Sequence, residues 1–374
     1  MTGAVAWHRS AHAYGPASDT PQHLRGLTDA DPATRRAALA HLWNAVLHQG
    51  SLYPVTAPVA EVIARMLPDD RLDRVELLTY LGHVAARASY YQANPDMVSY
   101  LRRDDPEVDA FEVYWEPADE PDFVIVRRWG SGCARRATVV VPCLMPWLDA
   151  PDPAERTAAL HAVACWMGLA GARLADPEPA LERLISVAGD DTAEPEHRID
   201  CVLGLAGAGA DTRDLLDDTS AVIRTCAALS PAVTADPRTL RVVTDALTWP
   251  GGCDGWLRDE PPVPHGGAML SERLVEAALR CTGDFDLLLP AALGVAEAAR
   301  PWSIDATWGP LLAAAFPQPR PARLRLGAAQ RAYLSALAAN DTLWREQRQD
   351  RTELLDGLGL PVDRAAIQAL TTAG

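Results

Sequence analysis

The sequence predicts an all-α fold in which helical hairpins follow one another in an array. Pro153, Pro195 and Pro237 are spaced 42 residues apart, and each follows an acidic residue and precedes an apolar helical run. A fixed period in this range is typical of helical repeats. Ala, Leu and Arg dominate, and no sustained alternation of apolar and polar residues predicts strands. The predicted architecture is a right-handed α–α superhelix, an α-solenoid, with two loop insertions.

The start of each repeat carries its own helix signal. The segment from Asp31 to Leu39 matches the segment from Asp152 to Leu160 almost letter for letter. An acidic residue before proline suits a helix start, because the carboxylate caps the first amides and proline has no amide to satisfy. The arginine one turn later is expected to pair with an aspartate of a neighbouring repeat. A turn and a second helix at 59–67 complete the first unit, and a second unit is expected from Asp70.

This combination of a DPxxR start, an Ala-rich first helix, a short turn and a second apolar helix resembles HEAT repeats. The runs 27–67 and 329–364 look like HEAT-repeat proteins of actinobacterial type. The resemblance implies a solenoid scaffold. It does not specify a function, because such arrays serve as scaffolds, adaptors and, in a few cases, enzymes.

Further along the chain, helices are expected at 271–281, 285–299, 303–316, 328–339 and 362–371. The predicted organisation has a mobile lead over residues 1–20 and a single solenoid over 21–374. Insertions interrupt it at about 89–132 and 249–268, and a capping segment closes it at about 322–374. Val124–Val126 is expected to form a short extended piece, whereas Gly and Pro residues in the second insertion argue against regular helix there.

Composition limits the function classes. All 34 basic residues are arginine, so chemistry that needs a lysine is excluded. The formal net charge of −16 disfavours a nucleic-acid partner, favours a basic one, and also fits a soluble surface. The seven cysteines have no framework spacing, and no apolar run approaches the roughly 18 residues of a membrane span, so a cytoplasmic protein with no membrane contact is expected.

The first insertion is the most unusual local feature, with nine acidic residues and no basic one between Asp104 and Asp122. Aromatic rings among these acids suit a basic partner, because the carboxylates steer its approach and the rings supply contact area. The alternative is a solvated loop whose rings fold back on the repeats. The predicted partner-binding residues are Asp109, Glu112, Tyr114, Trp115, Glu116, Asp119, Glu120, Asp122, Trp129 and Trp256.

Other candidate sites are weaker. Cys253 lies in a Gly-rich stretch that is expected to be non-helical, where His265 could activate it as a nucleophile, although an incidental surface thiol is the simpler interpretation. The histidines are scattered without zinc-type spacing, so no metal and no cofactor are expected. His161 and His41 occupy equivalent repeat positions, which suggests a structural role.

The function predicted from sequence is protein binding, as an adaptor or an immunity-type protein that neutralises a basic partner. The alternative is an enzyme on the HEAT scaffold that acts on a small molecule in specialised metabolism, with Trp residues around an Asp or Glu of perturbed pKa. A DNA glycosylase-like enzyme is less favoured, because its groove must be basic.

Overall fold

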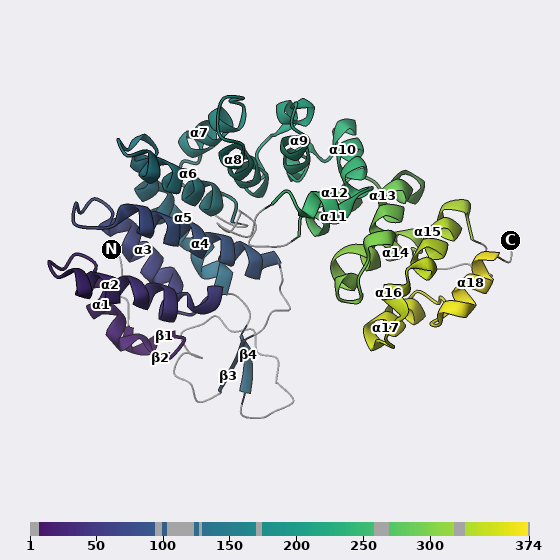
Figure 1. Ribbon diagram of the computed structural model, residues 1–374, viewed down its shortest axis with the longest axis horizontal. Helices are drawn as coiled ribbons and strands as arrows, with labels where there is room; N and C mark the ends of the chain where they lie inside the picture. The colour runs from purple at the N-terminus through teal and green to yellow at the C-terminus, as the bar shows by residue number, and fades with distance from the viewer. Residues whose placement is uncertain are drawn as a thin grey trace. The chain divides into compact units, whose positions relative to one another are not determined.

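Helices form nearly all of the regular structure, and the protein is all-α (Figure 1). The computed structural model describes residues 7–93, 99–102, 123–126, 129–169, 174–257, 269–317 and 326–372. The described residues divide into two compact units, here called the N-terminal unit (up to Ala210) and the C-terminal unit (from Asp211).

The elements of the N-terminal unit begin with short pieces and continue as helices. They are η1 (Trp7–Arg9), β1 (Ala11–His12), β2 (Gly15–Pro16), η2 (Ala17–Asp19), α1 (Thr20–Gly26), α2 (Pro32–His41), η3 (Leu42–Val46), η4 (His48–Gly50), α3 (Thr56–Met66), α4 (Arg74–Ala93), β3 (Ser99–Arg102), β4 (Phe123–Val126), α5 (Trp129–Leu144), η6 (Met145–Asp149), α6 (Pro153–Met167), α7 (Glu178–Ala188) and α8 (Pro195–Gly207).

The elements of the C-terminal unit are shorter on average. They are η7 (Arg213–Asp217), α9 (Ala221–Ala227), η8 (Pro231–Val233), α10 (Pro237–Leu247), α11 (Pro250–Asp254), α12 (Leu270–Cys281), α13 (Phe285–Ala298), η9 (Pro301–Ser303), η10 (Ile304–Trp308), α14 (Gly309–Ala315), α15 (Ala328–Ala339), α16 (Asp341–Trp344), α17 (Gln349–Gly357) and α18 (Arg364–Thr372).

The predicted helix starts are confirmed. Helices α2, α6, α8 and α10 each begin at the proline that the repeat marks. The carboxylate of Asp152 accepts a hydrogen bond from the Ala154 amide at 2.9 Å, and Asp31 and Asp236 cap α2 and α10 in the same way. Glu194 precedes α8, and its side chain makes no capping hydrogen bond. Glutamate is not among the side chains that favour this position.

The arginine one turn into these helices has a different role from the predicted one. Arg156 Nη1 donates to the carbonyl oxygens of Ala150 at 2.7 Å and Pro151 at 2.9 Å, in the turn that leads into its own helix. Arg35 makes the same pair of bonds to Asp29 and Ala30. The expectation of a partner aspartate in the next repeat is therefore wrong at these positions, because the guanidinium satisfies carbonyl groups of the preceding turn instead.

Helices two or three places apart in the chain pack side by side. In the N-terminal unit α4 packs on α6, α6 on α8, and α3 on α5. Trp166 on α6 is fully buried, and its indole nitrogen donates to the carbonyl of Leu81 on α4 at 2.9 Å. In the C-terminal unit α10 packs on α12 and α13, α13 on α15, and α15 on α18.

Helices α6 and α8 touch backbone to backbone. A Cβ atom added at Gly204 would lie 2.7 Å from the carbonyl oxygen of Ala164, and one added at Gly207 would lie 2.6 Å from that of Gly168. Real Cβ atoms essentially never come so close to a backbone oxygen. Glycine at these positions is therefore what allows the two helices to approach.

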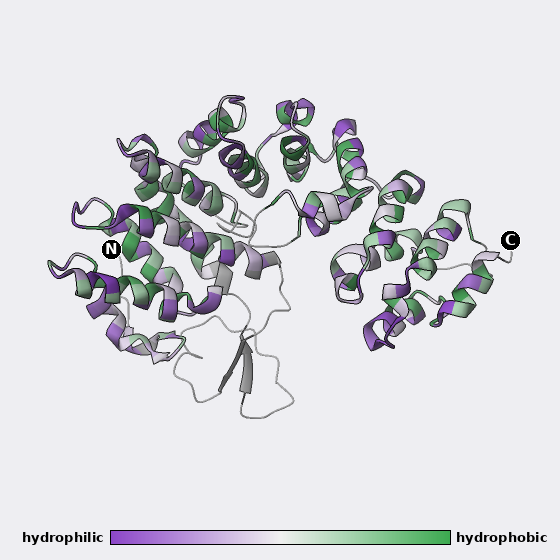
Figure 2. Cartoon of the chain, viewed as in Figure 1, coloured by the Kyte–Doolittle hydropathy of each residue, from purple (hydrophilic) through white to green (hydrophobic). Residues whose placement is uncertain are grey.

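The strands are short, and they pair locally. β1 and β2 form one antiparallel pair, and β3 and β4 form another in which Ser99 lies opposite Val126. The extended piece predicted at Val124–Val126 is thus confirmed as part of β4. Hydrophobic and hydrophilic residues are mixed on most helices (Figure 2). Among the described residues, no helix combines the length and the apolar character that crossing a membrane requires.

Candidate functional site

The structure describes only part of the predicted binding surface. The predicted residues Asp109, Glu112, Tyr114, Trp115, Glu116, Asp119, Glu120 and Asp122 lie outside the described residues. Trp129 begins α5, but its side chain is also outside the description. Trp256 is described. It follows α11 and is partly buried in the C-terminal unit.

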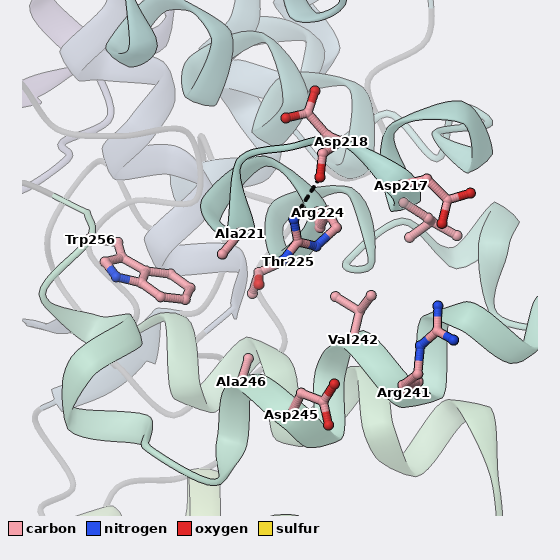
Figure 3. A pocket seen from close by; sticks show the side chains of 11 residues that line it. Asp217, Asp218, Ala221, Arg224, Thr225, Arg241, Val242, Asp245, Ala246 and Trp256 are labelled. Carbon is pink, nitrogen blue, oxygen red and sulfur yellow. Dashed lines mark hydrogen bonds between the residues drawn. The ribbon is translucent and has the colours of Figure 1, made fainter.

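Trp256 lines a hollow of about 490 Å³ between the η7–α9 segment and α10 (Figure 3). We call this hollow the α9–α10 groove. Its lining comprises Leu216, Asp217, Asp218, Ala221, Arg224, Thr225, Arg241, Val242, Asp245, Ala246 and Trp256. All of these residues belong to the C-terminal unit.

Small side chains at helical spacing open the groove. Ala221 and Thr225 lie four residues apart on α9, and Val242 and Ala246 lie four residues apart on α10. Residues at this spacing share one helix face, so each helix turns short side chains toward the groove and leaves space there. The indole of Trp256 forms one end, and Arg241 and Asp217 lie toward the other (Figure 3).

The charged side chains of the groove differ in how far they are already engaged. Arg224 Nη1 donates to the carbonyl oxygens of Asp218 at 2.6 Å and Thr219 at 3.1 Å, as Arg35 and Arg156 do in their helices. Asp217 accepts a hydrogen bond from Arg238. Within the described residues, no hydrogen bond engages the carboxylate of Asp245.

Arg241 and Asp245 are therefore the charged side chains of the groove that are most available to bind a ligand. Both are exposed and come from α10, one turn apart. Asp245 can accept hydrogen bonds from a cation, and Arg241 can donate to a carbonyl or carboxylate group. Together with an aromatic ring at one end and small side chains between the charges, these groups suit an extended polar segment that carries a basic side chain.

Cys253 does not have the properties of a nucleophile, and the prediction that it lies outside a helix is wrong. It belongs to the short helix α11, in which Pro250 occupies the first turn. The thiol is buried and donates to the carbonyl of Pro250 at 3.1 Å. Burial raises the pKa of Cys253 to about 12, so the thiolate is scarce at neutral pH. His265 lies outside the described residues.

A buried Cys–His–Asp arrangement joins α6 and α8. His161 Nδ1 and Asp200 Oδ2 are 2.7 Å apart, and His161 Nε2 is 3.5 Å from Cys165 Sγ. The order of groups is that of a catalytic triad, but all three residues are buried and burial raises the pKa of the Cys165 thiol. The arrangement therefore suits a structural tie between the helices better than a site of substrate attack.

A second cluster brings together histidines that are scattered along the sequence. Among the described residues, ligand-type atoms of His12, Asp19 and His41 all lie within 4.8 Å of one another, and the ring of His23 stacks on that of His41. No spacing rule signals this group, because its members come from β1, η2 and α2.

Two histidines, the buried His41 and the half-buried His83, predict how stability changes in acid. Burial and the neighbouring His23 lower the pKa of His41 from 6.5 to about 4, and burial and His161 lower that of His83 to about 4. Their neutral forms stabilise the fold above pH 6.5, and this contribution is lost as the pH falls from 6.5 toward 4. We expect the thermal midpoint of the protein to fall across this range. In a His83→Asn variant the fall should be smaller, and an unchanged fall would contradict the assignment.

Comparison with known proteins gives no further information about the site. No protein-family model matches the chain, and no curated protein matches it.

Proposed function

We propose that the protein is a protein-binding module, an adaptor or immunity-type protein of the cytoplasm, and that the α9–α10 groove holds a basic segment of its partner. The single observation that carries the proposal is that Trp256 and the Asp245 carboxylate line the same hollow over a floor of small side chains. In this view the chain is a right-handed solenoid of HEAT-like hairpins. The packing of helices two places apart supports that architecture.

The chemistry of the groove favours an arginine or lysine side chain. Its methylene stem can pack on Val242 and Ala246, and its charged head can meet Asp245 and the face of Trp256. Tryptophan and arginine are the residues most enriched among those that dominate binding energy at protein interfaces. The net charge of −16 adds a long-range attraction for a basic partner.

Arg241 complements this arrangement from the other end of the groove. Its guanidinium is exposed, and guanidinium donors bind carbonyl oxygens as well as carboxylates. A peptide whose basic side chain lies near Trp256 would bring its backbone carbonyls toward Arg241 (Figure 3). The groove thus suits a segment of polypeptide better than an isolated cation.

The test is the binding of a short arginine-rich peptide to the full chain, measured by fluorescence anisotropy. We expect Trp256→Ala and Asp245→Asn each to weaken binding by about tenfold, the loss of a strong interface contact. The effect of Asp245→Asn should shrink at high salt, because salt screens exposed charges.

Two control variants distinguish binding in the groove from a general attraction of the basic peptide to an acidic protein. Trp302→Ala removes another partly exposed indole (61% exposed) and Asp286→Asn another carboxylate of the C-terminal unit, and both variants should bind as the wild type does. If all four variants bind the peptide equally, the groove has no such role. In a separate arm, the acids of the 104–122 segment are neutralised, and unchanged affinity would exclude that segment from binding.

The volume of the groove also favours a second candidate, the binding of a small molecule. About 490 Å³ lies within the range of small-ligand sites, roughly 300–1,000 Å³. An enzyme that acts on a small molecule between Trp residues and an acid would use Asp245 against a ligand stacked on Trp256. Loss of a metabolite-induced thermal shift in Trp256→Ala, with no peptide binding in the wild type, would favour this candidate.

A further inference from the structure

We propose that His12, Asp19 and His41 form a binding site for a zinc-type divalent metal ion in the N-terminal unit. The site is separate from the α9–α10 groove and does not depend on the function proposed for it. Imidazole nitrogens with one carboxylate are a donor set typical of zinc sites that keep a position open for water or another ligand.

The distances already approach those of a coordination sphere. His12 Nε2 and Asp19 Oδ1 are 3.0 Å apart. Ligands bound at about 2.0–2.1 Å in a tetrahedron lie roughly 3.3 Å from each other, so this pair needs little movement. The ligand atom of His41 lies within 4.8 Å of the other two, so closing the gap to about 3.3 Å needs a movement of at most about 1.5 Å.

The surroundings keep the donor groups ready to bind. His12 and His41 are both buried, whereas the Asp19 side chain is 52% exposed, which leaves an approach from solvent. Burial raises the pKa of Asp19, but the hydrogen bond from His12 outweighs this and holds the pKa below its usual range. The imidazole of His41 is neutral at pH 7, so no proton competes with the ion there.

Neighbouring residues orient the rings. The ring of His23 stacks on that of His41 with centroids 4.0 Å apart and planes 9° from parallel. The hydroxyl of Thr20, which is fully buried, lies 3.0 Å from His41 Nε2. Such outer partners fix the direction in which a ligand nitrogen points, which is a common feature of metal sites.

Binding requires one local rearrangement at His12. Its Nδ1 accepts a hydrogen bond from the Tyr14 amide at 3.1 Å, so the ring proton lies on Nε2 and is donated to Asp19. A metal ion at Nε2 shifts this proton to Nδ1, and the Tyr14 amide must then turn away. The peptide that must turn lies between Ala13 and Tyr14, in the two-residue turn that connects β1 to β2, and Tyr14 is 69% exposed.

The test is a calorimetric titration of the chelator-treated full chain with zinc chloride. We expect one ion per chain in the wild type. Asp19→Asn and His41→Asn should each weaken zinc binding by about 100-fold. Removing a residue that only orients a ligand already costs up to about 100-fold, and these two residues are ligands themselves. Asp19→Asn is the decisive variant, because its half-exposed side chain can change without disturbing the core. Circular dichroism establishes that each variant is folded.

His48→Asn is the matched control. His48 lies nearby and bonds to Tyr14 Oη at 3.3 Å, but it is not a member of the cluster, so this variant should keep wild-type affinity. A second measurement uses the thermal midpoint, which zinc should raise in the wild type and in His48→Asn but not in Asp19→Asn. Wild-type binding no tighter than that of Asp19→Asn, or an equal loss in His48→Asn, would overturn the proposal.

Discussion

Replacing Asp200 by alanine is expected to destabilise the N-terminal unit by about 3–5 kcal/mol, the usual cost of removing one partner from a buried ion pair. Asp200 Oδ2 lies 2.7 Å from His161 Nδ1, and both residues are buried between α6 and α8. Without the carboxylate, the imidazole must either stay charged in an apolar place or lose its proton. Urea unfolding followed by circular dichroism measures the change.

The matched control is Asp149→Ala, which removes an aspartate that pairs with Arg183 at 2.9 Å where the two side chains are 80% and 42% exposed. Exposed pairs contribute about 0–1 kcal/mol, so this variant should differ little from the wild type. If the free energy of unfolding falls equally in the two variants, the buried pair stabilises the protein no more than an exposed pair does.

The pH dependence gives an independent readout of the same pair. Burial alone would lower the pKa of His161, but its contacts with Cys165 and with the Asp200 carboxylate outweigh this and raise the pKa well above 6.5. The stability that results is fully present below pH 6.5 and is lost as the pH rises through the raised pKa. In the Asp200→Ala variant this loss at alkaline pH should be smaller, because only the contact with Cys165 still raises the pKa of His161.

Replacing Trp166 by alanine is expected to cost a similar amount, about 3–5 kcal/mol, because it removes the largest fully buried side chain and leaves a cavity between α4 and α6. It also leaves the carbonyl of Leu81 without its 2.9 Å hydrogen bond from the indole. Thermal and urea unfolding measure the loss. Trp302→Ala, at a position 61% exposed, should change stability by less than about 0.5 kcal/mol. Comparable losses in both variants would mean that Trp166 does not hold these helices together.

Local chemistry explains why much of the helical structure could be predicted from the sequence. The Asp–Pro starts at Pro32, Pro153 and Pro237 depend only on neighbouring residues, and all three begin helices. The helix expected at 328–339 is likewise found as α15. The wrong expectation at Cys253 arose from its flanking glycines, which lower helix propensity but do not prevent one short turn that starts with proline.

The candidate sites depend on contacts that the sequence does not encode at fixed spacing. Trp256 was predicted as a binding residue, but its neighbours in the groove, Asp245 and Arg241, could not be assigned before α10 was placed beside it. The grouping of His12 with His41 likewise requires the fold of the segment between them. The solenoid architecture, the basic partner and the role of the 104–122 segment stay predictions.

The glycine contact between α6 and α8 also has a mechanical consequence. Where side chains separate two helices, rotamer changes let them slide or tilt by small steps. No such layer lies between Gly204 and Ala164, so at this point no rotamer change can let the two helices slide or tilt, and we expect them to move together. Any relative movement of helices within the N-terminal unit is therefore expected at contacts that side chains form, such as the contact between α3 and α5.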